Sequence, residues 1–134
     1  MPTETLYGRS DDDWDALVSA GTAFLIERAK LKKVTTYTEM NATLARRTDV
    51  APFDFDRADE RAAMGHLLGL IVESNRPTTN LMLSALVHYL GENDAGPGFF
   101  VLAQQLDLLP AGASADAKEK FWIGQVNALH AFYG

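Results

Sequence analysis

Residues 34–75 read VTTYTEMNATLARRTDVAPFDFDRADERAAMGHLLGLIVESN, and the fold expected for the chain follows from them. After the short β-branched segment 34–36, Thr36 and Glu39 have the spacing of a capping box, which marks the start of a helix. Met40 and Leu44 follow at helical spacing on the inward side, together with Tyr37. The pattern predicts a short strand followed directly by a helix that ends near residue 47.

A second helix is predicted over residues 57–75, after a loop that contains Pro52. Asp56 is the expected N-cap of this helix. The residues expected on its buried side are apolar: Met64, Leu68, Ile71 and Val72. The other side is small and polar, with Asp59, Ala62, His66, Gly69, Glu73 and Arg76. That side is compatible with contact to a nucleic-acid groove, to another helix or, by default, to water.

The flanking segments supply the other expected elements. Ser10 and Asp13 form a capping box for a helix that runs to about residue 31. Apolar residues on both sides of the segment 81–90 predict a buried central strand, and 91–96 has the composition of a hairpin turn. Two further helices are expected, one over 99–109 and one capped by Ser114.

The order of these elements predicts an α+β, mostly helical fold with a winged helix-turn-helix core. That core consists of a helix, a short strand, two helices and a β-hairpin, over residues 12–109. Residues 114–133 form a C-terminal helix that packs against the first helix, because each carries large apolar residues on one side. The whole chain, 1–134, is expected to be a single domain, although other α+β arrangements fit the same elements.

Composition excludes several classes of protein. The chain has 134 residues and no cysteine, so disulfide scaffolds, thiolate metal sites and cysteine nucleophiles are excluded. The sequence has neither a secretory leader pattern nor an apolar run long enough to cross a bilayer. A cytoplasmic protein without membrane attachment is therefore expected.

The net charge of −6 opposes non-specific attraction to nucleic acid, but the cations are clustered. If the second and third helices bind duplex DNA, phosphate contacts fall to cations on and beside these helices. The candidate nucleic-acid-binding residues are Lys32, Lys33, Tyr37, Arg46, Arg47, Arg57, Arg61 and Arg76. Ordinary solvated charges explain the same clusters without a partner.

Three stretches, Thr36–Met40, Arg61–Gly65 and Gly96–Phe99, resemble in order and spacing the winged-helix domain of the alkylguanine DNA alkyltransferases and alkyltransferase-like proteins. The resemblance covers roughly residues 34–109. It implies that Tyr37 corresponds to the tyrosine that steers the backbone near a flipped nucleotide. It also implies that Arg61 corresponds to the arginine that fills the vacated stack.

The reactive motif of that family is missing from this chain. It should fall near residues 82–85, which read MLSA and contain neither a cysteine nor a tryptophan. Alkyl transfer is thereby excluded. What the resemblance still implies is the fold and the binding of nucleic acid.

No catalytic constellation or cofactor motif is recognisable in the sequence. His66, His88 and His130 fall on three different predicted elements without metal-ligand spacing, so structural roles are expected for them. No phosphate-binding glycine loop is present. We therefore expect no enzyme activity, no metal and no cofactor.

Two functional hypotheses remain. The first is a non-catalytic winged-helix module that binds duplex DNA through its second and third helices. The second is a protein-interaction or assembly module, such as an adaptor or inhibitor, that uses apolar helix faces for a partner or for self-association.

Overall fold

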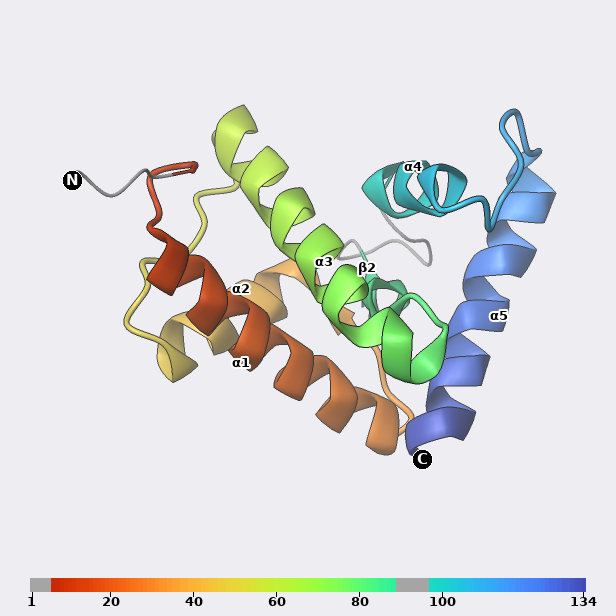
Figure 1. Ribbon diagram of the computed structural model, residues 1–134, viewed down its shortest axis with the longest axis horizontal. Coiled ribbons are helices and arrows are strands. Elements are labelled where there is room, and N and C mark those ends of the chain that lie inside the picture. Colours follow the sequence, from red (N-terminus) through yellow and green to blue (C-terminus); the bar gives the residue numbers. More distant parts are fainter. Residues whose placement is uncertain (1–5, 89–96) are drawn as a thin grey trace.

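The computed structural model describes residues 6–88 and 97–134 (Figure 1). The described elements, in chain order, are α1 (Asp11–Lys30), β1 (Thr35–Thr36), α2 (Tyr37–Arg47), α3 (Ala58–Thr79), the 3₁₀ helix η1 (Leu83–Leu86), β2 (Val87–His88), α4 (Pro97–Gln105) and α5 (Ala115–Tyr133). The strands form a two-stranded sheet. The predicted class, α+β and mostly helical, is confirmed.

The predicted capping signals set the starts of three helices. At α1, the backbone N–H of Asp13 donates to Ser10 Oγ at 3.2 Å, and the N–H of Ser10 donates to Asp13 Oδ2 at 3.1 Å. Thr36 caps α2 by accepting from the N–H of Glu39, and Ser114 caps α5 in the same way. These helices begin where local sequence satisfies their first N–H groups.

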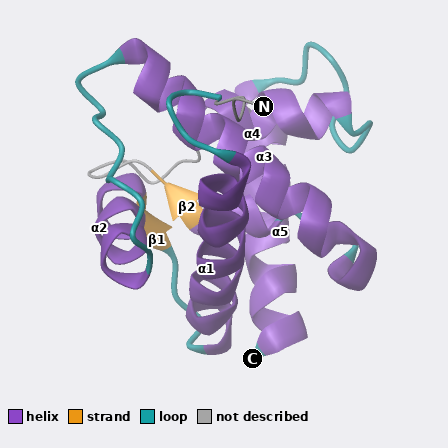
Figure 2. Cartoon of the chain, turned by 60° about the vertical axis from the view of Figure 1, so that its left-hand side comes forward, coloured by secondary structure: helices purple, strands orange, loops and turns teal. Residues whose placement is uncertain are grey.

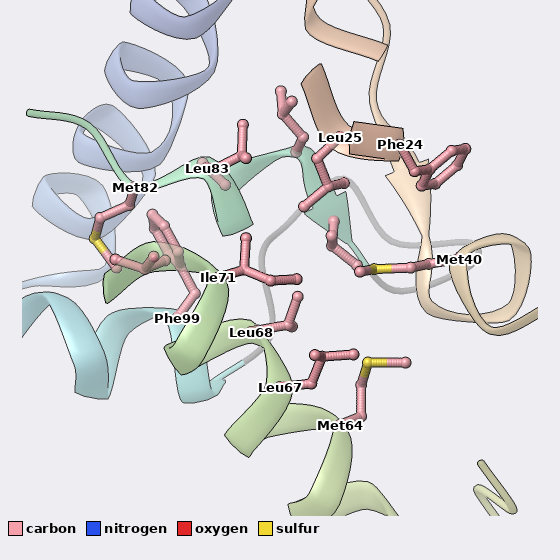
Figure 3. Packing of buried hydrophobic residues seen from close by; sticks show 14 of the residues in the cluster. Phe24, Leu25, Met40, Met64, Leu67, Leu68, Ile71, Met82, Leu83 and Phe99 are labelled. Carbon is pink, nitrogen blue, oxygen red and sulfur yellow. The ribbon is translucent and has the colours of Figure 1, made fainter. Parts of the chain in front are cut away.

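The core lies where α1 meets α2, α3, α5 and the segment around η1. Figure 3 shows Leu25 of α1, Met40 of α2, Ile71 of α3 and Leu83 of η1 converging, and all four side chains are fully buried. Beside them, Figure 2 shows the two strands next to α2.

The segment 81–90 is not the strand that the sequence predicts. Residues 83–86 form η1, and only Val87 and His88 are a described strand; residues 89 and 90 lie outside the described part. β2 pairs in parallel with β1, with Thr35 opposite Val87. Because the strands of a hairpin run antiparallel, this pair is not a wing. The predicted turn at 91–96 lies outside the described residues, and the chain is already helical at residue 97.

Helix α5 explains why the part of this segment before β2 does not need a neighbouring strand. The backbone N–H of Met82 donates to Gln125 Oε1 at 2.8 Å, and Trp122 Nε1 donates to the carbonyl of Ala85 at 2.8 Å. Side chains of a distant helix thus satisfy backbone groups that a sheet ladder would otherwise satisfy. An apolar run of this length does not reveal whether its backbone groups bond to a neighbouring strand or to side chains of a helix.

Three helix ends differ from those predicted. α3 begins after Arg57, which has no side-chain cap, so the assignment of Asp56 as N-cap is wrong. At its other end α3 continues through Pro77 to Thr79, where Asn80 ends it in the left-handed conformation at φ 57°. Pro77 has no N–H to donate to the carbonyl four residues earlier, and only two residues of α3 follow it. α4 ends at Gln105, earlier than expected.

The segment before α1 is fastened to the start of α3 by Arg9. Its guanidinium donates two hydrogen bonds to Glu60, at 2.8 and 3.1 Å, and lies 4.1 Å from the centre of the Phe53 ring. Arg9 is buried. The hydrogen bonds from Arg9 lower the pKa of Glu60 below its ordinary value.

Within the described residues, no helix is both long and apolar enough for a membrane span.

Candidate binding groove

The predicted nucleic-acid-binding residues do not gather on one face. Lys32 and Lys33 follow the end of α1, where His130 of α5 lies 3.1 Å from the carbonyl of Lys33. Arg57 and Arg61 lie at the opposite end of the molecule, at the start of α3, which projects at the top of Figure 1. Charges at opposite ends do not form one phosphate-binding surface.

Two of the predicted arginines are held by carboxylates. Arg47 donates two hydrogen bonds to Glu27 of α1, at 2.7 and 3.0 Å, and Arg57 donates two to Asp59, at 3.1 and 2.7 Å. The hydrogen bonds between Arg47 and Glu27 lower the pKa of Glu27 and raise that of Arg47. Both pairs are exposed, and each reduces the positive charge available to a phosphate.

Arg46 precedes Arg47 in α2, and Arg76 lies at the other end of α3 from Arg57 and Arg61. Arg46, in the last turn of α2, donates to Thr43 Oγ1 at 3.2 Å. Arg76, in the last turn of α3, has a buried Nε atom without a hydrogen-bond partner. Between Arg61 and Arg76 the helix rises by about 22 Å.

The structure does bring Tyr37 and Arg61 together. With Phe55, Met64 and Gly65 they line a hollow of about 330 Å³, here called the Tyr37 hollow. The rings of Tyr37 and Phe55 meet edge to face with centroids 6.5 Å apart, and Arg61 Nη1 donates to the carbonyl of Phe55 at 2.6 Å. The hollow is thus built from the starts of α2 and α3, the loop between them and Gly98 of α4.

Two further hollows continue from it between α3 and α4. The Ser84 cleft, about 500 Å³, shares Tyr37 and Gly65 with the Tyr37 hollow. The Arg76 hollow, about 510 Å³, shares Gly69, Glu73 and Leu102 with the Ser84 cleft. Because neighbouring hollows share lining residues of both α3 and α4, the three hollows form one elongated depression, here called the α3–α4 groove.

The walls of this groove are mostly apolar, and α3 contributes glycines to them. α4 contributes Phe99, Val101 and Leu102, and Val101 is 51% exposed. On α3, a Cβ atom added at Gly65 or Gly69 would meet nothing within 4 Å. The groove therefore has open space directly above the α3 backbone.

The groove also contains unsatisfied polar groups. Ser84, 3% exposed, lines the cleft that bears its name, and its Oγ atom has no hydrogen-bond partner. Arg76, with its unpartnered Nε, lines the far hollow. Buried polar groups in folded proteins are nearly always paired, so such exceptions require an explanation.

The histidines do not form a metal site. The ring of His66 meets Trp14 edge to face at 4.9 Å, His88 lies in β2 and His130 is in α5. Across residues 6–88 and 97–134, no group of three or more His, Cys, Asp or Glu side chains is placed to hold a metal ion.

Sequence reasoning identified only part of the groove. It found Tyr37, Arg61 and the small polar face of α3, including Gly69. It missed Ser84, which it assigned to a central strand, and the contribution of α4. The available signal was the unbroken apolar run of residues 99–103, which covers every side of a helix and therefore needs cover on more than one face.

No family model, curated protein or solved structure matches this chain.

Proposed function

We propose that this protein is a non-catalytic protein-interaction module, and that an amphipathic helix of a partner protein binds along the α3–α4 groove. The observation that carries this proposal is the shape of the groove. Its α3 wall runs from Arg61 to Arg76, about 22 Å, or about four helical turns. A long apolar depression of this kind suits a helix laid in a groove better than a compact ligand.

The glycines of α3 support the choice of a helix as the occupant. Gly65 and Gly69 are one turn apart, and both are open to the groove. Small residues at this spacing let two helix backbones approach closely. The facing residues of α4, Val101 and Leu102, supply apolar contact on the other side.

Charges along the groove define the complementary partner. Arg61 lines one end, and Glu73 lies about 18 Å further along α3, where the Ser84 cleft meets the Arg76 hollow. Arg76 follows Glu73 one helical turn later and lines only the far hollow. The partner helix is expected to place a carboxylate beside Arg61 and a cation beside Glu73. Such pairs fix the direction of binding more than its strength.

The test is selection of helical peptides of about 18 residues with a randomised apolar face, followed by fluorescence anisotropy of the selected peptides. Gly69→Leu is expected to weaken binding at least about tenfold, because it fills the groove. Gly124→Leu is the matched control, since Gly124 is also helical and open but lies on α5, outside the groove. Thermal melts establish that both variants are folded.

The proposal is contradicted if no peptide is selected, or if the selected peptides bind the Gly69→Leu variant as well as the unchanged protein. Equal losses from Gly69→Leu and Gly124→Leu also contradict it, because a general effect on folding then explains both.

Duplex-DNA binding by a winged-helix module is the second candidate. It is supported by the meeting of Tyr37 and Arg61 in one hollow and by the helix–strand–helix–helix order of the first four elements. The connection between α2 and α3, residues 48–57, is longer than the three- to four-residue turn of a helix-turn-helix. This candidate requires binding of random duplexes that falls steeply with salt and is weakened by Arg61→Glu. Absence of binding at low salt would eliminate it.

A further inference from the structure

We propose that the Ser84 cleft is the anchor pocket of the groove, and that it takes a tyrosine or tryptophan side chain of the partner helix with its polar atom hydrogen-bonded to Ser84 Oγ. This inference rests on the proposed function. It adds the chemical class of the side chain that enters and the residue that recognises it.

The unsatisfied hydroxyl is the first observation. Ser84 lies in η1, whose other residues, Leu83, Ala85 and Leu86, are also buried. Its Oγ atom is hidden from solvent and has no hydrogen-bond partner. A buried hydroxyl without a partner costs free energy, and a polar group that enters the cleft removes that cost. Because Ser84 lines the cleft, a polar group that reaches its Oγ atom from the cleft would supply the missing partner.

The lining of the cleft is the second observation. Phe99, Tyr37 and His66 contribute rings, and Leu68 and Leu102 contribute aliphatic surface. Its volume of about 500 Å³ falls in the range of small-molecule pockets, so the cleft has room for a side chain as large as tryptophan. Aromatic rings meet well edge to face, as Tyr37 and Phe55 already do next to the cleft. The lining therefore suits an aromatic side chain.

These two observations together select tyrosine or tryptophan. Leucine or phenylalanine would fill the cleft but leave Ser84 Oγ unpaired. Tyrosine and tryptophan combine a large apolar ring with a polar atom that needs a partner when it is buried, and they are enriched among the residues that dominate binding energy. A lysine would instead be drawn to Glu73, which also lines the cleft.

The experiment uses the full chain and one host peptide. The host is an alanine-based amphipathic helix of about 18 residues whose central apolar position is Tyr, Phe, Trp, Leu or Lys, and anisotropy gives each Kd. We expect the Tyr peptide to bind about fivefold more tightly than the Phe peptide, as for one net hydrogen bond. In Ser84→Ala the two peptides should bind equally.

Thr22→Val is the matched control for Ser84→Ala. Thr22 Oγ1 is also a buried hydroxyl oxygen without a partner, but Thr22 lies on α1, and the hollow that it lines shares only Leu70 and Glu73 of α3 with the Ser84 cleft. The advantage of Tyr over Phe should persist in Thr22→Val. Thermal melts of both variants show that each is folded at the temperature of the binding measurement.

The outcomes separate this inference from the proposed function. Equal binding of the Tyr and Phe peptides by the unchanged protein overturns the anchor inference and leaves the groove proposal standing. A Tyr advantage that survives Ser84→Ala, or tightest binding by the Lys peptide, overturns it as well. If none of the five peptides binds, both proposals fail.

Discussion

Gly21 of α1 lies so close to Ile71 of α3 that a Cβ atom added at Gly21 would be 2.7 Å from Ile71 Cδ1. The same added atom would be 3.2 Å from Met40 Cε of α2. Three helices thus meet at a position where an added methyl group would force the ends of the Ile71 and Met40 side chains to shift. This close approach differs from the environment of Gly69, where the space above the helix is open.

Alanine substitutions at these two glycines are expected to have opposite effects on stability. Gly21→Ala should lower the free energy of unfolding by up to about 2 kcal/mol, because the cost of displacing Ile71 and Met40, about 1–3 kcal/mol, exceeds the gain of about 1 kcal/mol in helix propensity. Gly69→Ala should raise it by about 0.5–1 kcal/mol, because alanine favours the helix and meets no neighbour. Urea unfolding measures both, and a shift of the same sign in the two variants would contradict this account of the packing.

The contact between Arg9 and Glu60 should make stability depend on pH. The hydrogen bonds from Arg9 lower the pKa of Glu60 from 4.5. The stabilisation is therefore complete above about pH 4.5, and it is lost as the pH falls through the lowered pKa. Urea unfolding measures the free energy of unfolding at about pH 7 and about pH 3. Between these two pH values, that free energy should fall less in Glu60→Gln than in the unchanged protein. Equal losses would mean that other carboxylates account for the acid sensitivity.

Phe24 is expected to be among the most important side chains for stability. It is 5% exposed, and the guanidinium groups of Arg28 and Arg47 lie 5.2 and 5.5 Å from its ring centre. Phe24→Ala should reduce the free energy of unfolding by about 3–5 kcal/mol, because it leaves a cavity and removes both cation–π contacts. Phe132→Ala is the control, since Phe132 is 50% exposed and should change stability by less than about 1 kcal/mol.

Trp122 should stabilise the fold through its N–H group as well as through its ring. Trp122→Phe keeps most of the apolar contact but leaves the carbonyl of Ala85 without the indole N–H. The expected loss is about 1–3 kcal/mol, the cost of an unpaired buried group. Thermal or urea unfolding that shows no loss would mean that water satisfies this carbonyl in the variant.

Local sequence determined where α1, α2 and α5 begin and that residues 64–72 are helical. The caps at Ser10, Thr36 and Ser114 and the apolar periodicity of residues 64–72 involve groups within one or two helical turns. Such interactions are readable from the chain because the partners are close in sequence. The same holds for the class of fold and for the absence of cysteine chemistry.

Tertiary structure alone decided the secondary structure of residues 81–88 and the shape of the α3–α4 groove. Gln125 and Trp122 satisfy the backbone at Met82 and Ala85 from about 40 positions away, so no local pattern distinguishes η1 from a strand. Likewise, Glu27 neutralises Arg47 across 20 positions. The α3–α4 groove exists because α4 is placed beside the open face of α3. Local propensity carries no information about that placement, since it depends on how distant apolar surfaces pack.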